Sequence, residues 1–178
     1  MKKFQSKTTP PVIGRQIFLL LIVITVSIAS CKKEIEPGGS DKQLTTAEKS
    51  ANGLPHVVVK SGASIQAAID AAGAGTIIFI QPGTYSEAIH VAKAGIQLIG
   101  MDEKDKEIII QNPGTEEDGI EVTAAGNGFV LKNVTVQNFE ENGVLLTSVD
   151  NFVLDHVKAI NNKEYGLFPV FCHHGVIT

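Results

Sequence analysis

Residues 56–80 contain two kinds of apolar pattern, one typical of strands and one typical of a helix. Residues 56–59 form a short run rich in branched aliphatic side chains, which is typical of a strand. Apolar residues then recur at helical spacing, which predicts a helix with one apolar stripe: Ile65, Ala68, Ile69 and Ala72. Ser64 is a suitable N-cap for this helix, and two following glycines predict its end. A second apolar run, residues 76–80, predicts another strand.

The second half of the chain repeats a glycine followed by alternating residues. Three such segments begin at spacings of 24 and 23 residues: Gly119-Ile-Glu-Val-Thr, Gly143-Val-Leu-Leu-Thr and Gly166-Leu-Phe-Pro-Val. A second and a third segment follow each of the first two: residues 129–132 and 134–138, then 152–155 and 157–161. Residues 108–112 resemble an earlier copy of the third segment, and residues 96–99 an earlier copy of the first. Repetition at this period indicates a solenoid.

Each segment alternates apolar and polar side chains, so one of its faces is apolar. Ile120 points to one side, for example, and Glu121 to the other. A single unit cannot bury such a face, whereas stacked units bury it continuously, with Phe129 against Phe152. We therefore predict an all-β fold over residues 56–178, a parallel β-helix with three short strands per coil and an N-terminal capping helix.

Asparagines recur at the end of the third segment: Asn112, Asn138 and Asn161. Strand parity places them inward, where an unpaired amide is costly, so we expect a structural ladder of stacked Asn side chains. A leucine-rich repeat is the alternative fold, because residues 154–161 look like its motif and its period covers the same range. Three strand segments per unit favour the β-helix.

Residues 1–30 have the pattern of an export signal, since basic residues precede an apolar run over residues 17–28. That run is shorter than the roughly 20 residues that span a bilayer, which disfavours a transmembrane helix. Ile28-Ala29-Ser30-Cys31 resembles the lipobox of bacterial lipoproteins, which implies lipidation of Cys31. A disulfide with Cys172 is the alternative. Residues 31–55 are polar and punctuated by Gly and Pro, which predicts a flexible tether.

Charge is distributed unevenly along the chain. The formal net charge is −4, which does not favour nucleic-acid binding. Residues 1–30 hold four of the 15 basic residues and none of the 19 acidic ones, so 11 basic residues (15 − 4) remain beyond them. Arg15 is the only arginine in the sequence. The part beyond the export signal is therefore acidic and lacks guanidinium groups.

The sequence also resembles the opening of pectin-lyase-like proteins, and especially bacterial proteins that contain parallel β-helix repeats. The resemblance covers residues 57–178 and rests on residues 64–70, residues 80–85, Glu87 and residues 96–100. It implies a right-handed parallel β-helix with the helix as its cap. The superfamily includes polysaccharide lyases, epimerases and esterases, whose sites join carboxylates to Arg or Lys.

No such catalytic set, cofactor or metal site can be assigned from the sequence. Acidic residues 102–105 and 116–118 fall in predicted loops, where adjacent carboxylates are usually solvated and do not converge as Ca²⁺ ligands do. Adjacent residues on a strand point to opposite faces, which disfavours a metal site at His173 and His174. His90 and His156 have no companion in the sequence, and Cys172 is interpreted as a small buried side chain.

One outward row of the predicted sheet is a candidate for glycan contact: Glu121, Leu145 and Phe168. Long solenoid faces form extended binding surfaces, although apolar side chains outside a coil are more often covered by a loop. We expect a lipoprotein of the bacterial cell envelope, anchored through Cys31, whose β-helix binds or scaffolds polysaccharide. The alternative is the N-terminal part of a polysaccharide-processing enzyme with catalytic residues beyond Thr178, because the last repeat stops in mid-coil.

Overall fold

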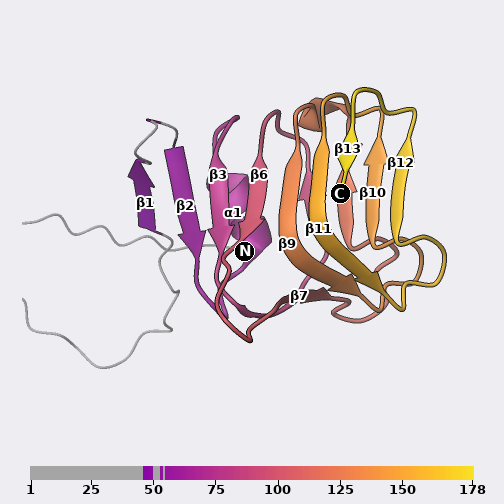
Figure 1. Ribbon diagram of the computed structural model, residues 1–178, viewed down its shortest axis with the longest axis horizontal. Helices are drawn as coiled ribbons and strands as arrows, with labels where there is room; N and C mark the ends of the chain where they lie inside the picture. The colour runs from indigo at the N-terminus through magenta and orange to yellow at the C-terminus, as the bar shows by residue number, and fades with distance from the viewer. Residues whose placement is uncertain (1–45, 50–52, 54) are drawn as a thin grey trace, which may run out of the picture. The chain divides into compact units, whose positions relative to one another are not determined.

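The computed structural model describes residues 46–49, 53 and 55–178. The chain divides into two units, Met1–Gly39 and Ser40–Thr178, and all described residues lie in the second. The predicted export signal, Cys31 and most of the predicted tether therefore lie outside the described residues. The described part consists mostly of parallel strands that form a β-solenoid of about five turns (Figure 1). None of the helices in this part is long and apolar enough to cross a membrane.

Within the described residues, one α-helix, α1 Ile65–Ala71, and one 3-10 helix, Ala124–Gly126, accompany the strands. The strands are β1 Thr46–Lys49, β2 Pro55–Val59, β3 Ile77–Ile80, β4 Gly83–Ser86, β5 Ile89–Val91, β6 Gln97–Gly100, β7 Ile108–Gln111, β8 Ile120–Val122, β9 Val130–Gln137, β10 Val144–Thr147, β11 Val153–Ile160, β12 Leu167–Val170 and β13 Val176–Ile177. The strands and the helix predicted over residues 56–80 are thus present.

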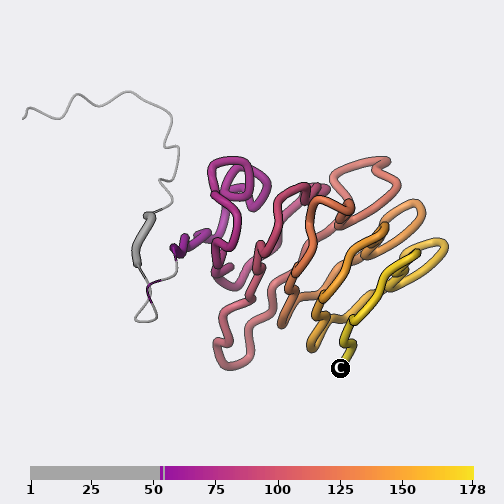
Figure 2. The backbone as a smooth tube through the Cα atoms, turned by 90° about the horizontal axis from the view of Figure 1, so that it is seen from above, coloured from indigo at the N-terminus to yellow at the C-terminus, as the bar shows by residue number. Residues whose placement is uncertain are grey.

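Successive coils stack strand upon strand in three parallel faces (Figure 2). The first face runs β2-β3-β6-β9-β11-β13, the second joins β4, β7 and the later halves of β9 and β11, and the third runs β5-β8-β10-β12. The predicted parallel β-helix is confirmed. The alternative prediction of a leucine-rich repeat is wrong, because turns and one 3-10 helix join the strands from β3 onward, and no α-helix does.

The pairing register follows the hydrophobic repeat in the later coils. Ile120 pairs with Val144 and Val134 with Val157. The N–H of Val153 donates to the carbonyl of Phe129 over 2.9 Å, which places Phe152 over Phe129. Both rings are buried, as the stacking argument requires.

The earliest predicted copy belongs to a different face. Leu98 in β6 pairs with Leu131 in β9, so residues 96–99 copy the second segment of the repeat and not the first. The earlier copy of the first segment is β5, where Ile89 pairs with Ile120. The prediction was wrong here because every segment alternates in the same way, so alternation does not say which face a segment joins.

The second and third segments of the later units form one bent strand. In β9 and β11 the backbone turns at Asn133 and His156, whose φ angles are 56° and 53°. Left-handed residues recur at the corners in pairs 23 positions apart: Asn133 and His156, Asn138 and Asn161, Ser148 and Phe171, and Asn151 and His174. Four of these eight residues are Asn, which tolerates the left-handed region better than other side chains with a Cβ.

The expected inward ladder of Asn side chains is not present, because these residues lie in turns. Asn138 and Asn161 are exposed at left-handed corners, so strand parity does not carry over to their side chains. Asn112 closes its own turn, because its Oδ1 accepts from the N–H groups of Gly114 and Glu116 at 2.8 and 3.1 Å. The three residues thus shape turns, and the inward ladder is wrong.

Side chains of the first coil form hydrogen bonds to both ends of the capping helix. The Ser64 hydroxyl accepts from the N–H of Ala67, as expected of an N-cap. The Glu87 carboxylate accepts from the N–H groups of Ile65 and Gln66, and the Lys93 ammonium donates to carbonyls at the C-terminal end. An anion at the first turn and a cation at the last both stabilise a helix. The capping helix is therefore confirmed.

The buried Tyr85 lies next to this cap, on the second face of the first coil. Burial, followed by the charge of Glu87, raises the pKa of Tyr85 to about 12. Its hydroxyl stays protonated at neutral pH and donates to the carbonyl of Gln81 at 2.7 Å.

The strand β1 lies within the segment expected to be a flexible tether. It pairs antiparallel with β2, Thr46 with Val58, and so adds regular structure there.

Candidate functional site

Four outward positions of the third face form one continuous row, which we call the outer row: His90, Glu121, Leu145 and Phe168. Glu121 pairs with Leu145, and Leu145 pairs with Phe168, so the three predicted positions lie in register. His90 adds a fourth, since it pairs with Glu121 in the same sheet. Neighbouring parallel strands are about 4.8 Å apart, so the row extends over several coils.

The polar end of the outer row is held in place by hydrogen bonds. His90 Nδ1 lies 3.0 Å from Glu121 Oε2. The Gln66 side chain accepts from the His90 N–H at 2.7 Å and donates to the His90 carbonyl at 3.2 Å. The sequence suggested no companion for His90, because its partner lies 31 residues away.

The other end of the outer row is aromatic. The rings of Tyr165 and Phe168 stack with centroids 4.3 Å apart and planes 17° from parallel. Tyr165 is 51% exposed, so this aromatic pair lies at the surface. Sequence analysis missed Tyr165 because it precedes the strand. Its position directly before Gly166, as Asn142 stands before Gly143, was the available signal.

Carboxylates line the edge of the third face where its strands begin. A groove of about 430 Å³ contains His90 and Glu121 of the outer row together with residues 116–118. The loop expected to be merely solvated therefore borders the outer row. Its Asp118 carboxylate accepts from the Nδ2 of the buried Asn142 at 2.7 Å.

Along the same edge, three glutamates from successive coils stack on one another. We call this stack the acidic edge: Glu117, Glu141 and Glu164. The N–H of Glu141 donates to the carbonyl of Glu117 at 2.8 Å, and the N–H of Glu164 to the carbonyl of Glu141 at 2.9 Å. Desolvation, followed by the charges of Glu117, Glu164 and Asp118, raises the pKa of Glu141. Sequence alignment of coils could have found this stack, because the three glutamates precede the repeated glycines by two residues.

A second polar cluster lies at the corner where β9 and β11 bend. Asp155 lies 2.5 Å from His156 Nδ1 and 3.2 Å from Lys132 Nζ, and it accepts from the Thr178 hydroxyl at 2.8 Å. Hydrogen bonds from Thr178, His156 and Lys132 lower the pKa of Asp155 to about 2. The expectation that His156 has no companion is wrong. The backbone corner at His156 turns the His156 ring toward Asp155.

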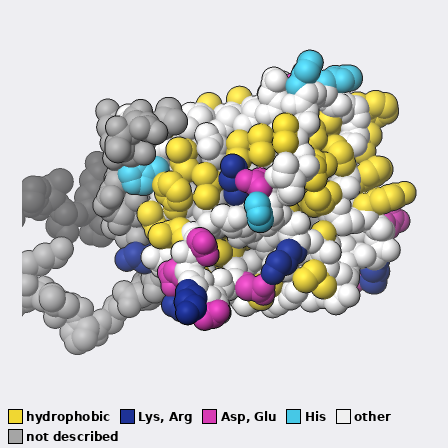
Figure 3. Space-filling view, viewed as in Figure 1, with side chains coloured by type: hydrophobic (Ala, Val, Ile, Leu, Met, Phe, Trp, Pro, Cys, Tyr) yellow, Lys and Arg dark blue, Asp and Glu magenta, His cyan; other side chains and the backbone are white. Residues whose placement is uncertain are grey.

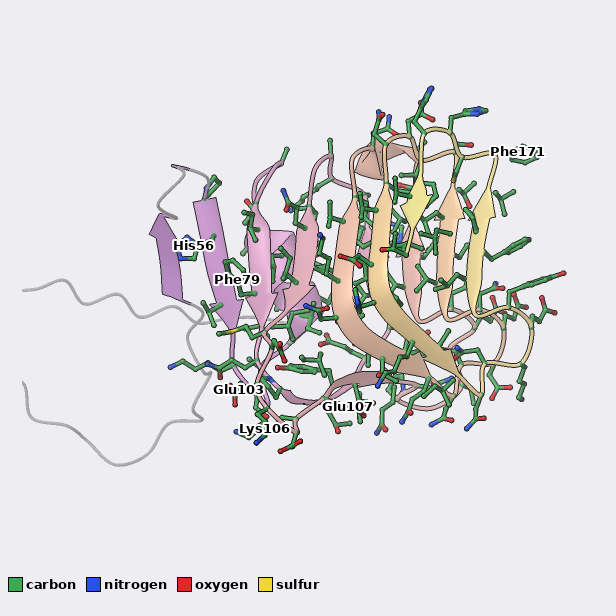
Figure 4. All side chains as sticks on the ribbon, in the orientation of Figure 1. His56, Phe79, Glu103, Lys106, Glu107 and Phe171 are labelled. Atoms are coloured by element: carbon green, nitrogen blue, oxygen red, sulfur yellow. The ribbon has the colours of Figure 1, made fainter. Side chains whose placement is uncertain are left out.

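The loop between β6 and β7 lines a groove together with His156 and carries charges of both signs (Figures 3 and 4). Glu103 pairs with Lys106 and Glu107 with Lys158, each at 2.7 Å. Two of the four acidic residues of this loop are thus paired with lysines, whereas no ion pair with Lys or Arg reaches Glu117, Glu141 or Glu164 among residues 55–178.

The remaining candidates do not converge on a site. The His173 and His174 rings are exposed, with centroids 6.4 Å apart. The Cys172 Sγ donates to the carbonyl of Leu146 at 3.4 Å, and the side chain packs against the core, but it is only partly buried and not buried as expected. No group of three or more His, Cys, Asp or Glu among the described residues is arranged to hold a metal ion.

Comparisons of the chain with protein-family models, with curated proteins and with solved structures gave no match.

Proposed function

We propose that this protein is a lipid-anchored component of the bacterial cell envelope that binds or scaffolds polysaccharide along the outer row, without catalysing a reaction. The stacked rings of Tyr165 and Phe168 carry the proposal. Aromatic faces offer large, rigid apolar surface, which suits the apolar faces of sugar rings. The neighbouring Leu145, Glu121 and His90 continue this surface with one apolar and two polar side chains.

The arrangement suits a long ligand better than a small one. The outer row crosses several coils of a solenoid face, a geometry that favours extended ligands. The groove at its polar end is open to hydrogen bonding by hydroxyl groups through His90 and Glu121. The resemblance to pectin-lyase-like proteins, a superfamily of polysaccharide-processing enzymes, agrees with this class of ligand.

Replacing Phe168 or Tyr165 by Ala is expected to weaken binding to polysaccharide about tenfold, because each change removes half of the aromatic pair. Affinity electrophoresis of the full chain in separate gels containing neutral, amino-bearing or acidic polysaccharides measures the change. Phe171→Ala is the matched control, since Phe171 is 80% exposed and projects from the far end of β12 (Figure 4). Equal retardation of all variants, or no retardation in any gel, contradicts the proposal.

Cys31→Ala is expected to move the protein from the membrane fraction to the soluble fraction of a bacterial host. Lipid chains on Cys31 supply the anchoring energy, and stable anchoring takes more than one chain. Cys172→Ala is the matched control, because Cys172 packs within the solenoid. Fractionation followed by immunoblotting measures the outcome. Membrane retention of the Cys31 variant argues against lipid anchoring.

A further inference from the structure

We infer that the polysaccharide bound at the outer row carries amino groups, so that the ligand is a cationic amino-sugar polymer and not a polyuronate. This inference rests on the proposed function, and it assigns the ligand class from the charge beside the outer row. The apolar and aromatic members of the row do not select a charge, whereas the acidic edge next to them does.

The acidic edge and the outer row belong to one surface. The groove of about 430 Å³ contains both His90 and Glu121 of the outer row and Glu117 at the start of the acidic edge. At the other end, Glu164 directly precedes Tyr165, whose ring lies on Phe168. A chain lying along the row therefore passes beside the carboxylates at both ends.

The acidic edge is not neutralised within the protein. Among residues 55–178, no Lys or Arg forms an ion pair with Glu117, Glu141 or Glu164, whereas the adjacent Glu140 pairs with Lys163. Stacked carboxylates at one coil spacing repel one another, and the raised pKa of Glu141 follows in part from that repulsion. A bound cation relieves the repulsion, and a polyanion increases it.

Asn142 adds an independent sign that the edge lacks a donor. This residue is 4% exposed, and its Nδ2 reaches Asp118 at 2.7 Å. Its Oδ1 has no hydrogen-bond partner in the structure. A buried acceptor without a donor is costly, so Asn142 marks a local shortage of N–H donors beneath the acidic edge. Protonated amino groups of a bound chain supply the positive charge that the acidic edge lacks.

Binding of three oligosaccharides of equal length to the full chain tests the inference: oligomers of glucosamine, N-acetylglucosamine and galacturonate. The pH is chosen so that the amines are protonated and the carboxylates ionised. We expect the glucosamine oligomer to bind about tenfold more tightly than its acetylated counterpart at low salt, with the difference shrinking as salt screens the charges. Isothermal titration calorimetry measures both affinities.

The double variant Glu117→Gln and Glu164→Gln is expected to lose most of that preference while it still binds the acetylated oligomer. Glu103→Gln, which removes a charge from the loop between β6 and β7, outside the groove at the outer row, is expected to leave the preference unchanged. A preference that survives in the double variant overturns the inference, as does equal affinity for the two amino-sugar oligomers. Tighter binding of the galacturonate oligomer, with or without added Ca²⁺, also overturns it. If no oligomer binds, the proposed function itself fails.

Discussion

Replacing Phe129 by Ala is expected to lower the free energy of unfolding by about 3–5 kcal/mol. Phe129 is completely buried, and backbone hydrogen bonds place it between Ile96 in the coil below and Phe152 in the coil above. Truncation removes apolar surface from the core and leaves a cavity that two neighbouring coils share. Because each coil packs only on its neighbours, the loss weakens the contact between them directly.

Urea unfolding followed by circular dichroism measures this change as a lower transition midpoint. Phe171→Ala removes the same side chain from a position that is 80% exposed, and we expect it to change stability by no more than about 0.5 kcal/mol. Similar midpoints for the two variants are incompatible with the stacked core described above.

Replacing Gly119 by Ala is expected to destabilise the protein by about 1–3 kcal/mol, because the added methyl group has no room. A Cβ at this position lies 2.6 Å from the carbonyl oxygen of Gly143 in the next coil and 2.5 Å from Val136 Cγ1. The Gly119 N–H donates to the Asn142 carbonyl at 2.9 Å, so separation of the coils also weakens a hydrogen bond. The repeated glycine is thus required for close approach of coils.

Gly114→Ala is the matched control for Gly119→Ala. An added Cβ at Gly114 meets no atom within 4 Å, and we expect little change in stability. Thermal unfolding of the two variants separates the effects, with a lower midpoint for Gly119→Ala alone. A wild-type midpoint for Gly119→Ala means that the coils can move apart without cost.

The fold was predictable because local pattern and stacking agree in the later coils. Alternation fixes which side chains of a segment turn inward, and identical spacing fixes which ones meet, as with Phe129 and Phe152. The first coils repeat less regularly, so alternation assigned residues 96–99 to the wrong face. The Asn ladder was wrong for a related reason: strand parity ends where the backbone becomes left-handed, as at Asn138 and Asn161.

The candidate site was predictable only where it repeats. Glu121, Leu145 and Phe168 were found because they occupy the same position in successive units. His90 and Tyr165 were missed, since one belongs to an irregular early coil and the other lies in a turn. The acidic edge was missed because adjacent acids in a loop suggest solvation, and only the stacking of loops shows that Glu117, Glu141 and Glu164 lie above one another.

By itself, the sequence determined a solenoid of parallel strands, because a hydrophobic repeat with period two inside each segment buries its apolar face only by stacking. It also determined the helix that caps the first coil, since the N-cap and the apolar stripe are local features. Only the tertiary structure decided which face each early segment joins, how the corners turn their side chains, and which charges meet across coils. These depend on contacts between residues 20 or more positions apart, and their geometry is set by backbone turns that alternation does not encode.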